Sequence, residues 1–110
     1  MEANRIVQGK IPVVQDDSYT LYLDEFEGLQ FIHCDIYKWN KTTKKALHVS
    51  LKYILDLYKV PIYAAHEIKD NKHRKFLEMY GFKYFSTEHC LDNINRQVWI
   101  NKEEGRNYNG

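Results

Sequence analysis

The sequence predicts a single α/β (α+β) domain with a mixed, mostly antiparallel sheet, one parallel β-α-β crossover and two helices. Its 110 residues suffice for one domain and not for two. Short apolar runs bounded by Gly, Asp and Asn occupy both ends of the chain, which is typical of strands and turns. Between them, apolar residues recur with the helical period and a buried strand follows, which indicates the crossover.

Residues 1–28 are expected to form an antiparallel meander. Apolar runs at 6–7, 11–15 and 19–26 are each followed by turn-forming residues, the last of them Glu27-Gly28. In the third run leucines alternate with polar or amphipathic residues, as in a strand buried on one face.

The segment 29–39 is predicted to be the longest strand. Alternate side chains of a strand point to opposite faces, so one face here is apolar while the other mixes aromatic and ionisable groups. The mixed face carries Phe31, His33, Asp35 and Tyr37.

An amphipathic helix is predicted over 42–59, where apolar side chains recur every three or four residues. Asn40, Thr42 and Thr43 are all acceptable N-caps, and Pro61 prevents the helix from continuing. The compact apolar run 60–65 then predicts a buried strand.

A second, shorter helix begins at Asp70 or Asn71 and ends at Gly81, a residue suited to helix termination. Two further strands are expected at 82–89 and 97–100. We therefore expect one domain over residues 1–100, with the meander at 1–28 and the core at 29–100, followed by a loose polar tail at 101–110.

The net charge of +1 argues against a polycation whose whole surface binds nucleic acid. Residues 38–75 nevertheless carry ten Lys and Arg against three Asp and Glu, which favours attraction of an anion. Two widely spaced cysteines, no apolar membrane span and no apolar leader predict a cytoplasmic protein with free thiols and no membrane partner. No metal-ligand spacing is present.

The string Asp70-Asn71-Lys72-His73-Arg74-Lys75-Phe76-Leu77-Glu78-Met79-Tyr80-Gly81-Phe82 resembles the segment that closes the second conserved helix of GNAT-fold N-acetyltransferases. The order of elements from about residue 29 to 101 is similar to that family's core. In particular, the chain resembles the short GNAT-like proteins of tailed phages. The resemblance implies an acyl-CoA-dependent N-acyltransferase that transfers an acetyl group to an amine.

The same resemblance implies that the strands 31–37 and 60–66 separate to admit the pantetheine arm of acetyl-CoA. The start of the 42–59 helix would then meet the pyrophosphate. The residues implied in cofactor binding are Tyr37, Trp39, Lys41, Thr42, Thr43, Lys44, Lys45 and Asn71.

His33 and Asp35 are the candidate catalytic base, because an imidazole next to a carboxylate can accept an amine proton directly or through water. A hydrogen-bonded pair on a partly wet sheet face is the structural alternative. The family's usual tyrosine acid is Leu77 in this sequence; Tyr80, three residues later, is the candidate acid that remains.

A catalytically inactive module is the alternative function, either a phage virion component or a host-directed protein-binding module. The loop before the first helix, Trp39-Asn40-Lys41-Thr42-Thr43, has no glycine to bring backbone N–H groups onto a phosphate. An active enzyme would take a small-molecule or protein amine as acceptor, whereas an inactive module would bind a protein in a phage assembly or in the host. We expect no nucleic-acid partner in either case.

Overall fold

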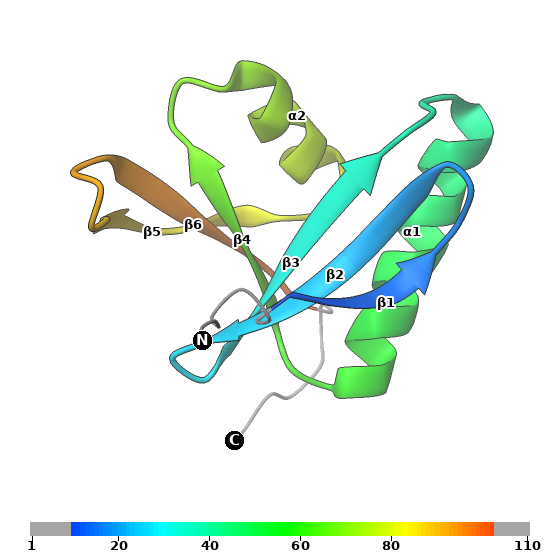
Figure 1. Ribbon diagram of the computed structural model, residues 1–110, viewed down its shortest axis with the longest axis horizontal. Helices are drawn as coiled ribbons and strands as arrows, with labels where there is room; N and C mark the ends of the chain where they lie inside the picture. The colour runs from blue at the N-terminus through cyan, green and yellow to red at the C-terminus, as the bar shows by residue number, and fades with distance from the viewer. Residues whose placement is uncertain (1–9, 103–110) are drawn as a thin grey trace, which may run out of the picture.

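The computed structural model describes residues 10–102, which fold into six strands and two helices (Figure 1). The predicted fold class and order of elements are confirmed. The elements are β1 (Ile11–Gln15), β2 (Tyr19–Phe26), β3 (Leu29–Ile36), α1 (Lys41–Tyr58), β4 (Ile62–Glu67), α2 (Asn71–Met79), β5 (Lys83–His89) and β6 (Asn95–Asn101).

All six strands belong to one sheet in the order β1-β2-β3-β4-β6-β5. β3 and β4 are parallel, and every other neighbouring pair is antiparallel. A parallel pair needs a long connection, and α1 provides it. The predicted β-α-β crossover is therefore present.

Helix α1 begins at Lys41 because the side chain of Asn40 accepts a hydrogen bond from the backbone N–H of Thr43 at 2.9 Å. Among the three predicted caps, Asn40 is thus the one used. The helix ends at Tyr58, where Lys59 adopts a left-handed conformation with φ of 57°. Pro61 follows two residues later, where its ring and missing N–H would not allow another helical turn.

Helix α2 is capped by Asp70, whose carboxylate accepts the N–H of His73 at 3.0 Å. Gly81 follows with φ of 89°, a conformation that glycine adopts without steric penalty. This turn returns the chain directly into β5.

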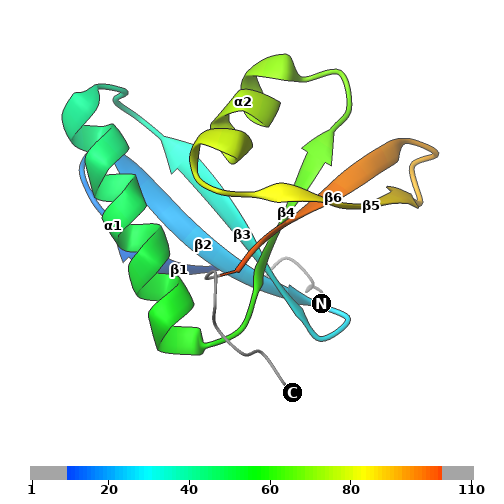
Figure 2. The same cartoon turned by 180° about the vertical axis from the view of Figure 1, so that it is seen from behind.

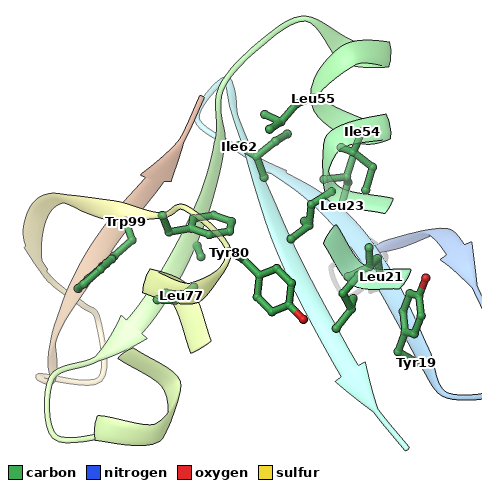
Figure 3. Close-up of a cluster of buried hydrophobic side chains, with 13 residues drawn as sticks. Tyr19, Leu21, Leu23, Ile54, Leu55, Ile62, Leu77, Tyr80 and Trp99 are labelled. Carbon is green, nitrogen blue, oxygen red and sulfur yellow. The ribbon is translucent and has the colours of Figure 1, made fainter. Parts of the chain in front are cut away.

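Both helices pack on the same face of the sheet, as the view from behind shows (Figure 2). The hydroxyl of Tyr80, which follows α2, donates to the backbone carbonyl of Lys44 in α1 at 3.0 Å. The core lies between these helices and the sheet (Figure 3). Its buried residues are Tyr19, Leu21, Leu23, Leu47, Leu51, Ile54, Leu55, Ile62, Ala64, Leu77, Tyr80, Phe82 and Trp99.

The opposite face of the sheet carries a row of aromatic rings that no helix within residues 10–102 covers. Phe31 of β3 contacts Phe26 and Tyr63, with ring centroids 6.4 Å and 5.8 Å apart. Tyr63 in turn contacts Phe85, at 5.5 Å. Phe26 and Phe85 are exposed. Neither helix of the described residues is long and apolar enough to cross a bilayer.

The predicted strand 29–39 is too long, because β3 ends at Ile36. Its neighbour β2 begins at Tyr19, opposite Ile36, so no partner strand extends further. The N–H groups of Tyr37 and Lys38 both donate to the carbonyl of Ser18, which turns the chain away from the sheet.

The other boundaries differ by a few residues. β4 runs from Ile62 to Glu67 rather than over 60–65, and β6 extends to Asn101, which is buried and donates to the carbonyl of Tyr80 at 2.8 Å. The tail was therefore predicted to begin too early. The predicted strand at 6–7 and the segment 103–110 lie outside the described residues.

Candidate active site

β3 and β4 form a cleft because they pair only at their beginnings. Gln30 is paired with Ile62 and Phe31 with Tyr63; beyond these residues the two strands diverge (Figure 1). A cavity of about 540 Å³ occupies the gap, with walls from both strands and both helices. The expected separation of these two strands is confirmed.

The wall on the helix side of the cavity is apolar. Leucines from α1, aromatic and aliphatic side chains from α2, and the inward face of β3 supply it. Examples are Leu47, Leu51, Phe76, Leu77 and Ile32. Such a wall suits an uncharged, flexible ligand segment because burying it releases water from apolar surface.

Polar side chains also line the cavity. His33 and Asp35 come from β3 and Lys10 from the residue before β1, while Lys72 and His73 come from the first turn of α2. Cations and carboxylates are therefore mixed around an apolar interior. A small number of polar groups converging on an apolar pocket is typical of ligand sites.

One edge of β4 is open toward the cavity. The other edge is fully paired with β6, from Ile62 opposite Asn101 to Glu67 opposite Arg96. Beyond Tyr63, no strand of the described chain pairs with β4 on the β3 side. Backbone N–H and C=O groups along Ala64 and Ala65, which line the cavity, can therefore bond an extended ligand as an added strand would.

His33 lies in the cavity wall. The carboxylate nearest to it is Asp24 on β2, rather than Asp35 on its own strand, with which it was expected to pair. Nε2 of His33 is 3.7 Å from Oδ2 of Asp24, whereas Asp35 contributes only a weaker electrostatic effect. The Nε2 atom is buried and makes no hydrogen bond within the described residues. Burial and the positive charge of Lys10 lower the pKa of His33, which keeps its imidazole neutral at neutral pH.

Asp35 also lines the cavity but is more exposed than His33. Its carboxylate accepts a hydrogen bond from the Tyr22 hydroxyl, and this bond is the main reason why the pKa of Tyr22 is raised. The structure thus places both predicted base residues in one wall, each with a different partner. Their catalytic role stays a prediction.

Tyr80 lies in the core rather than in the wall of the cavity. Its side chain is 5% exposed and its hydroxyl donates to the Lys44 carbonyl. Burial raises its pKa to about 12, so the proton is held more tightly than in a free tyrosine. Its predicted role as an acid also remains a prediction.

The predicted phosphate-binding residues at the start of α1 differ in accessibility. Lys41, Thr42, Lys44 and Lys45 are exposed, whereas Thr43 is 2% exposed. The N–H and hydroxyl of Thr43 both donate to the Asn40 side chain. That N–H is therefore already satisfied, while the lysines remain accessible to an anion.

The other predicted cofactor residues are spread around the cleft. Tyr37 is exposed and its hydroxyl bonds that of Thr20 at 2.9 Å. The ring of Trp39, half exposed, lies 6.1 Å from that of Phe76, a residue of the cavity wall. Asn71 is exposed as the first residue of α2.

Cys34 faces the cavity from β3. Burial and the nearby charge of Asp35 raise the pKa of its thiol to about 12. Thiolate is the nucleophilic form of cysteine, so this side chain is an apolar wall residue rather than a nucleophile.

A histidine pair is the feature that sequence reasoning missed. Nδ1 of His66, on β4, lies 2.9 Å from Nδ1 of His73, on α2. The two histidines are seven residues apart, one near the end of β4 and the other in the first turn of α2. This short separation is the signal that could have indicated the contact, because α2 folds back over the end of β4.

No protein-family model matches this sequence, and no curated protein resembles it at the sequence level. Solved structures do resemble the fold. The ribosomal-protein-S5-alanine acetyltransferase from Vibrio fischeri superposes with a TM-score of 0.63 at 14% identity, over 82% of this chain and 56% of that one. An acetyltransferase of the GNAT family from Bacillus anthracis gives 0.64 at 16% identity, over 87% and 67%.

The NatC complex bound to Gag peptide and CoA also contains a similar chain. Its TM-score is 0.56 at 13% identity, with 77% of this chain and 59% of that chain covered. The described chain therefore has the fold of GNAT acetyltransferases, and it spans between 56% and 67% of the length of these neighbours.

Proposed function

We propose that this protein, which has the fold of GNAT acetyltransferases, transfers an acyl group from acyl-CoA to an amine in the cleft between β3 and β4. The observation that carries the proposal is the divergence of these two parallel strands after Phe31 and Tyr63 around a cavity of about 540 Å³. This cavity combines an open strand edge with an unpaired, neutral imidazole. The strand edge can hold the acyl donor by backbone hydrogen bonds, and the imidazole can accept a proton from the acceptor amine.

The residues present fit the acyl and pantetheine parts of such a substrate. The apolar wall accepts the alkyl segments, and the free edge of β4 offers hydrogen bonds to the amides of the arm. At the phosphate end, Lys41, Lys44 and Lys45 would hold the pyrophosphate as point charges in place of a glycine-rich backbone cradle. Acyl-CoA supplies an activated thioester.

His33 is the base in this mechanism. Its neutral imidazole takes a proton from the acceptor amine as the nitrogen attacks the thioester carbonyl carbon. The Asp24 carboxylate 3.7 Å away stabilises the imidazolium that forms. Asp35, fixed by the Tyr22 hydroxyl, attracts the cationic amine to this side of the cleft. There the ammonium group first loses one proton to solvent, and the neutral amine that results attacks while His33 takes the second proton.

The free N–H groups of β4 stabilise the negative charge that develops on the carbonyl oxygen. When the carbon–sulfur bond breaks, the sulfur leaves as a thiolate and takes a proton from solvent. The new amide forms on the side of His33 and Asp35. The acceptor therefore approaches from the sheet face that no helix of residues 10–102 covers, opposite to α1 and α2.

Binding and turnover test the proposal separately. Acetyl-CoA at millimolar concentration should raise the melting temperature of the protein, and free CoA should do so as well. Release of free thiol in the presence of a panel of amines should exceed the rate without protein. Absence of any thermal shift with both compounds would refute acyl-CoA binding.

A protein-binding module that has lost the chemistry is the second candidate. It is favoured by two groups already engaged within the fold: the Thr43 N–H bonds Asn40, and the Tyr80 hydroxyl bonds the Lys44 carbonyl. Such a module would bind a protein in a phage assembly or in the host. Binding of acetyl-CoA without turnover of any amine would favour this candidate over the enzyme.

A further inference from the structure

We propose that His66 and His73 form a hydrogen-bond donor site in the cavity wall, in which His66 holds His73 so that Nε2–H of His73 donates to a carbonyl oxygen of the bound acyl-pantetheine arm. This inference rests on the proposed function and deepens it, because it assigns a specific contact to that ligand. His73 is here a binding residue and His66 a positioning residue.

The pair is formed by the fold rather than by neighbouring sequence. His66 lies near the end of β4 on the helix side of the sheet and is 1% exposed. His73 belongs to the first turn of α2 and lines the cavity. The Nδ1 atoms lie 2.9 Å apart, a hydrogen-bond distance, so one of the two nitrogens carries the proton and the other accepts it.

The unused nitrogen of His66 decides between the two arrangements. Its Nε2 is buried and has no hydrogen-bond partner within the described residues. If His73 donated from Nδ1, the neutral His66 would carry its proton on this buried Nε2 and leave an N–H unsatisfied. If His66 donates from Nδ1, only a lone pair is left without a partner, and buried unpaired acceptors are better tolerated than buried unpaired donors.

With His66 as donor, Nδ1 of His73 accepts and the proton of His73 is held on Nε2. This Nε2 makes no hydrogen bond to any residue of the described chain and is not among its buried unpartnered atoms. A donor in the wall of a ligand cavity is thus left free. Its natural partner is an uncharged acceptor such as a thioester or amide carbonyl, because His73 itself is neutral.

Neighbouring groups keep both rings neutral and in place. Burial lowers the pKa of both histidines, and the proximity of His73 lowers that of His66 further, while Asp70 acts in the opposite direction on both. The ring of His66 meets Trp99 edge-on at 5.6 Å, and His73 stacks on Phe76 at 6.4 Å. The direction of the free N–H is therefore fixed before a ligand arrives.

Nitrogen NMR of the whole protein tests the tautomers directly. Two-dimensional ¹⁵N–¹H spectra near pH 8 should show a protonated Nε2 and a pyridine-like Nδ1 for His73, and the reverse for His66. Assignment of the His73 proton to Nδ1 would overturn the proposal, whether or not the protein binds acyl-CoA.

Acetyl-CoA binding to variants tests the contact. His73→Leu should weaken binding about tenfold, as expected for the loss of one well-oriented hydrogen bond. His73→Gln, whose amide nitrogen can replace Nε2–H, should stay within about threefold of the unaltered protein. His89→Gln, on the distant β5–β6 hairpin, is the matched control and should not change binding.

His66 variants separate positioning from packing. His66→Asn can still donate to Nδ1 of His73 and should preserve binding, whereas His66→Leu fills the buried site without a donor and should weaken binding about fivefold. Equal affinity of His66→Leu, His73→Leu and the unaltered protein would overturn the inference while leaving the proposed function intact. If the unaltered protein binds no acetyl-CoA, the ligand contact is refuted together with the proposed function.

Discussion

His33 owes its chemical character mainly to burial and to two charged neighbours, Lys10 and Asp24, that lie outside its own strand. Burial and Lys10 lower its pKa, while Asp24 raises it. The net effect is a lowered pKa and an imidazole that is neutral, and therefore basic, at neutral pH. Its Nε2 is buried and makes no hydrogen bond within the described residues, so no other group of the described chain engages this nitrogen.

His33→Gln should lower kcat by about 10² or more, because a general base contributes that much to proton transfer. In the unaltered protein, kcat/KM should rise with pH through a pKa below the ordinary value of about 6.5. Lys10→Gln should move this rise to higher pH and Asp24→Asn should move it to lower pH. A pH profile that is identical in both variants would exclude His33 as the titrating base.

Replacing Tyr80 distinguishes its predicted role as a catalytic acid from a purely structural role. Tyr80→Phe removes the hydrogen bond to the Lys44 carbonyl and leaves the ring in the core. We expect the free energy of unfolding to fall by about 1 kcal/mol, measured by urea denaturation, with turnover unchanged. A large fall in kcat at unchanged stability would instead support Tyr80 as the acid.

At the scale of elements, the start of α1 combines a satisfied cap with accessible lysines. The Asn40 side chain takes up the Thr43 N–H, so the helix end contributes fewer free amides than a glycine loop would. Lys44 and Lys45, both exposed, follow within the first turns. Affinity for a pyrophosphate should therefore depend on charge and on ionic strength.

The double variant Lys44→Gln/Lys45→Gln should weaken acetyl-CoA binding about tenfold at low salt, with a smaller effect at high salt. The control Lys83→Gln/Lys102→Gln removes the same charge from the β5–β6 part of the sheet and should have little effect. Calorimetric titration of each variant at two salt concentrations makes the comparison. Equal affinities of the two double variants would contradict a phosphate site at α1.

Asn40→Asp tests the same phosphate site by adding a negative charge at the start of α1 instead of removing positive charges. Aspartate caps a helix as well as asparagine does, so the melting temperature should be retained. Its negative charge next to the pyrophosphate should nevertheless weaken acetyl-CoA binding severalfold. Asn40→Ala should instead lower the free energy of unfolding by about 1 kcal/mol.

At the scale of the whole molecule, three buried or half-buried histidines make stability dependent on pH. The pKa values of His33, His66 and His73 are all lowered in the folded state, chiefly by burial. The unfolded chain therefore binds more protons than the native state once the pH falls below about 6.5. Stability contributed by these groups is complete above that pH and is lost as the pH falls toward the native pKa values.

The melting temperature should accordingly fall between about pH 7.5 and about pH 5.5, a range in which ordinary carboxylates remain ionised. The variant His66→Asn/His73→Asn should lose less over this range than the unaltered protein, even if it is less stable at the upper pH. Differential scanning calorimetry at matched ionic strength measures both. If the melting temperatures of the two proteins fell in parallel with pH, the histidine pair would not be the cause of the pH dependence.

The elements and their order follow from local patterns in the amino-acid sequence. The helical period of α1, the caps at its start and at Asp70, and the positive φ at Gly81 are local consequences of residue type, so they were predictable. Strand ends were less predictable. β3 ends at Ile36 because its neighbour β2 begins at the paired residue Tyr19 and offers no further partner. The separation of β3 and β4 was inferred from family resemblance rather than from spacing.

Which side chains lie together depends on how the elements pack in three dimensions. His33 was expected beside Asp35, but its nearest carboxylate is Asp24, because strand register rather than chain neighbourhood fixes distances across a sheet. The His66–His73 contact exists because α2 returns over the end of β4. The spacing of apolar residues along the chain predicts which face of a helix or strand a residue occupies. Contacts between elements depend instead on the packing of residues that are far apart in the sequence, so no local pattern indicates them.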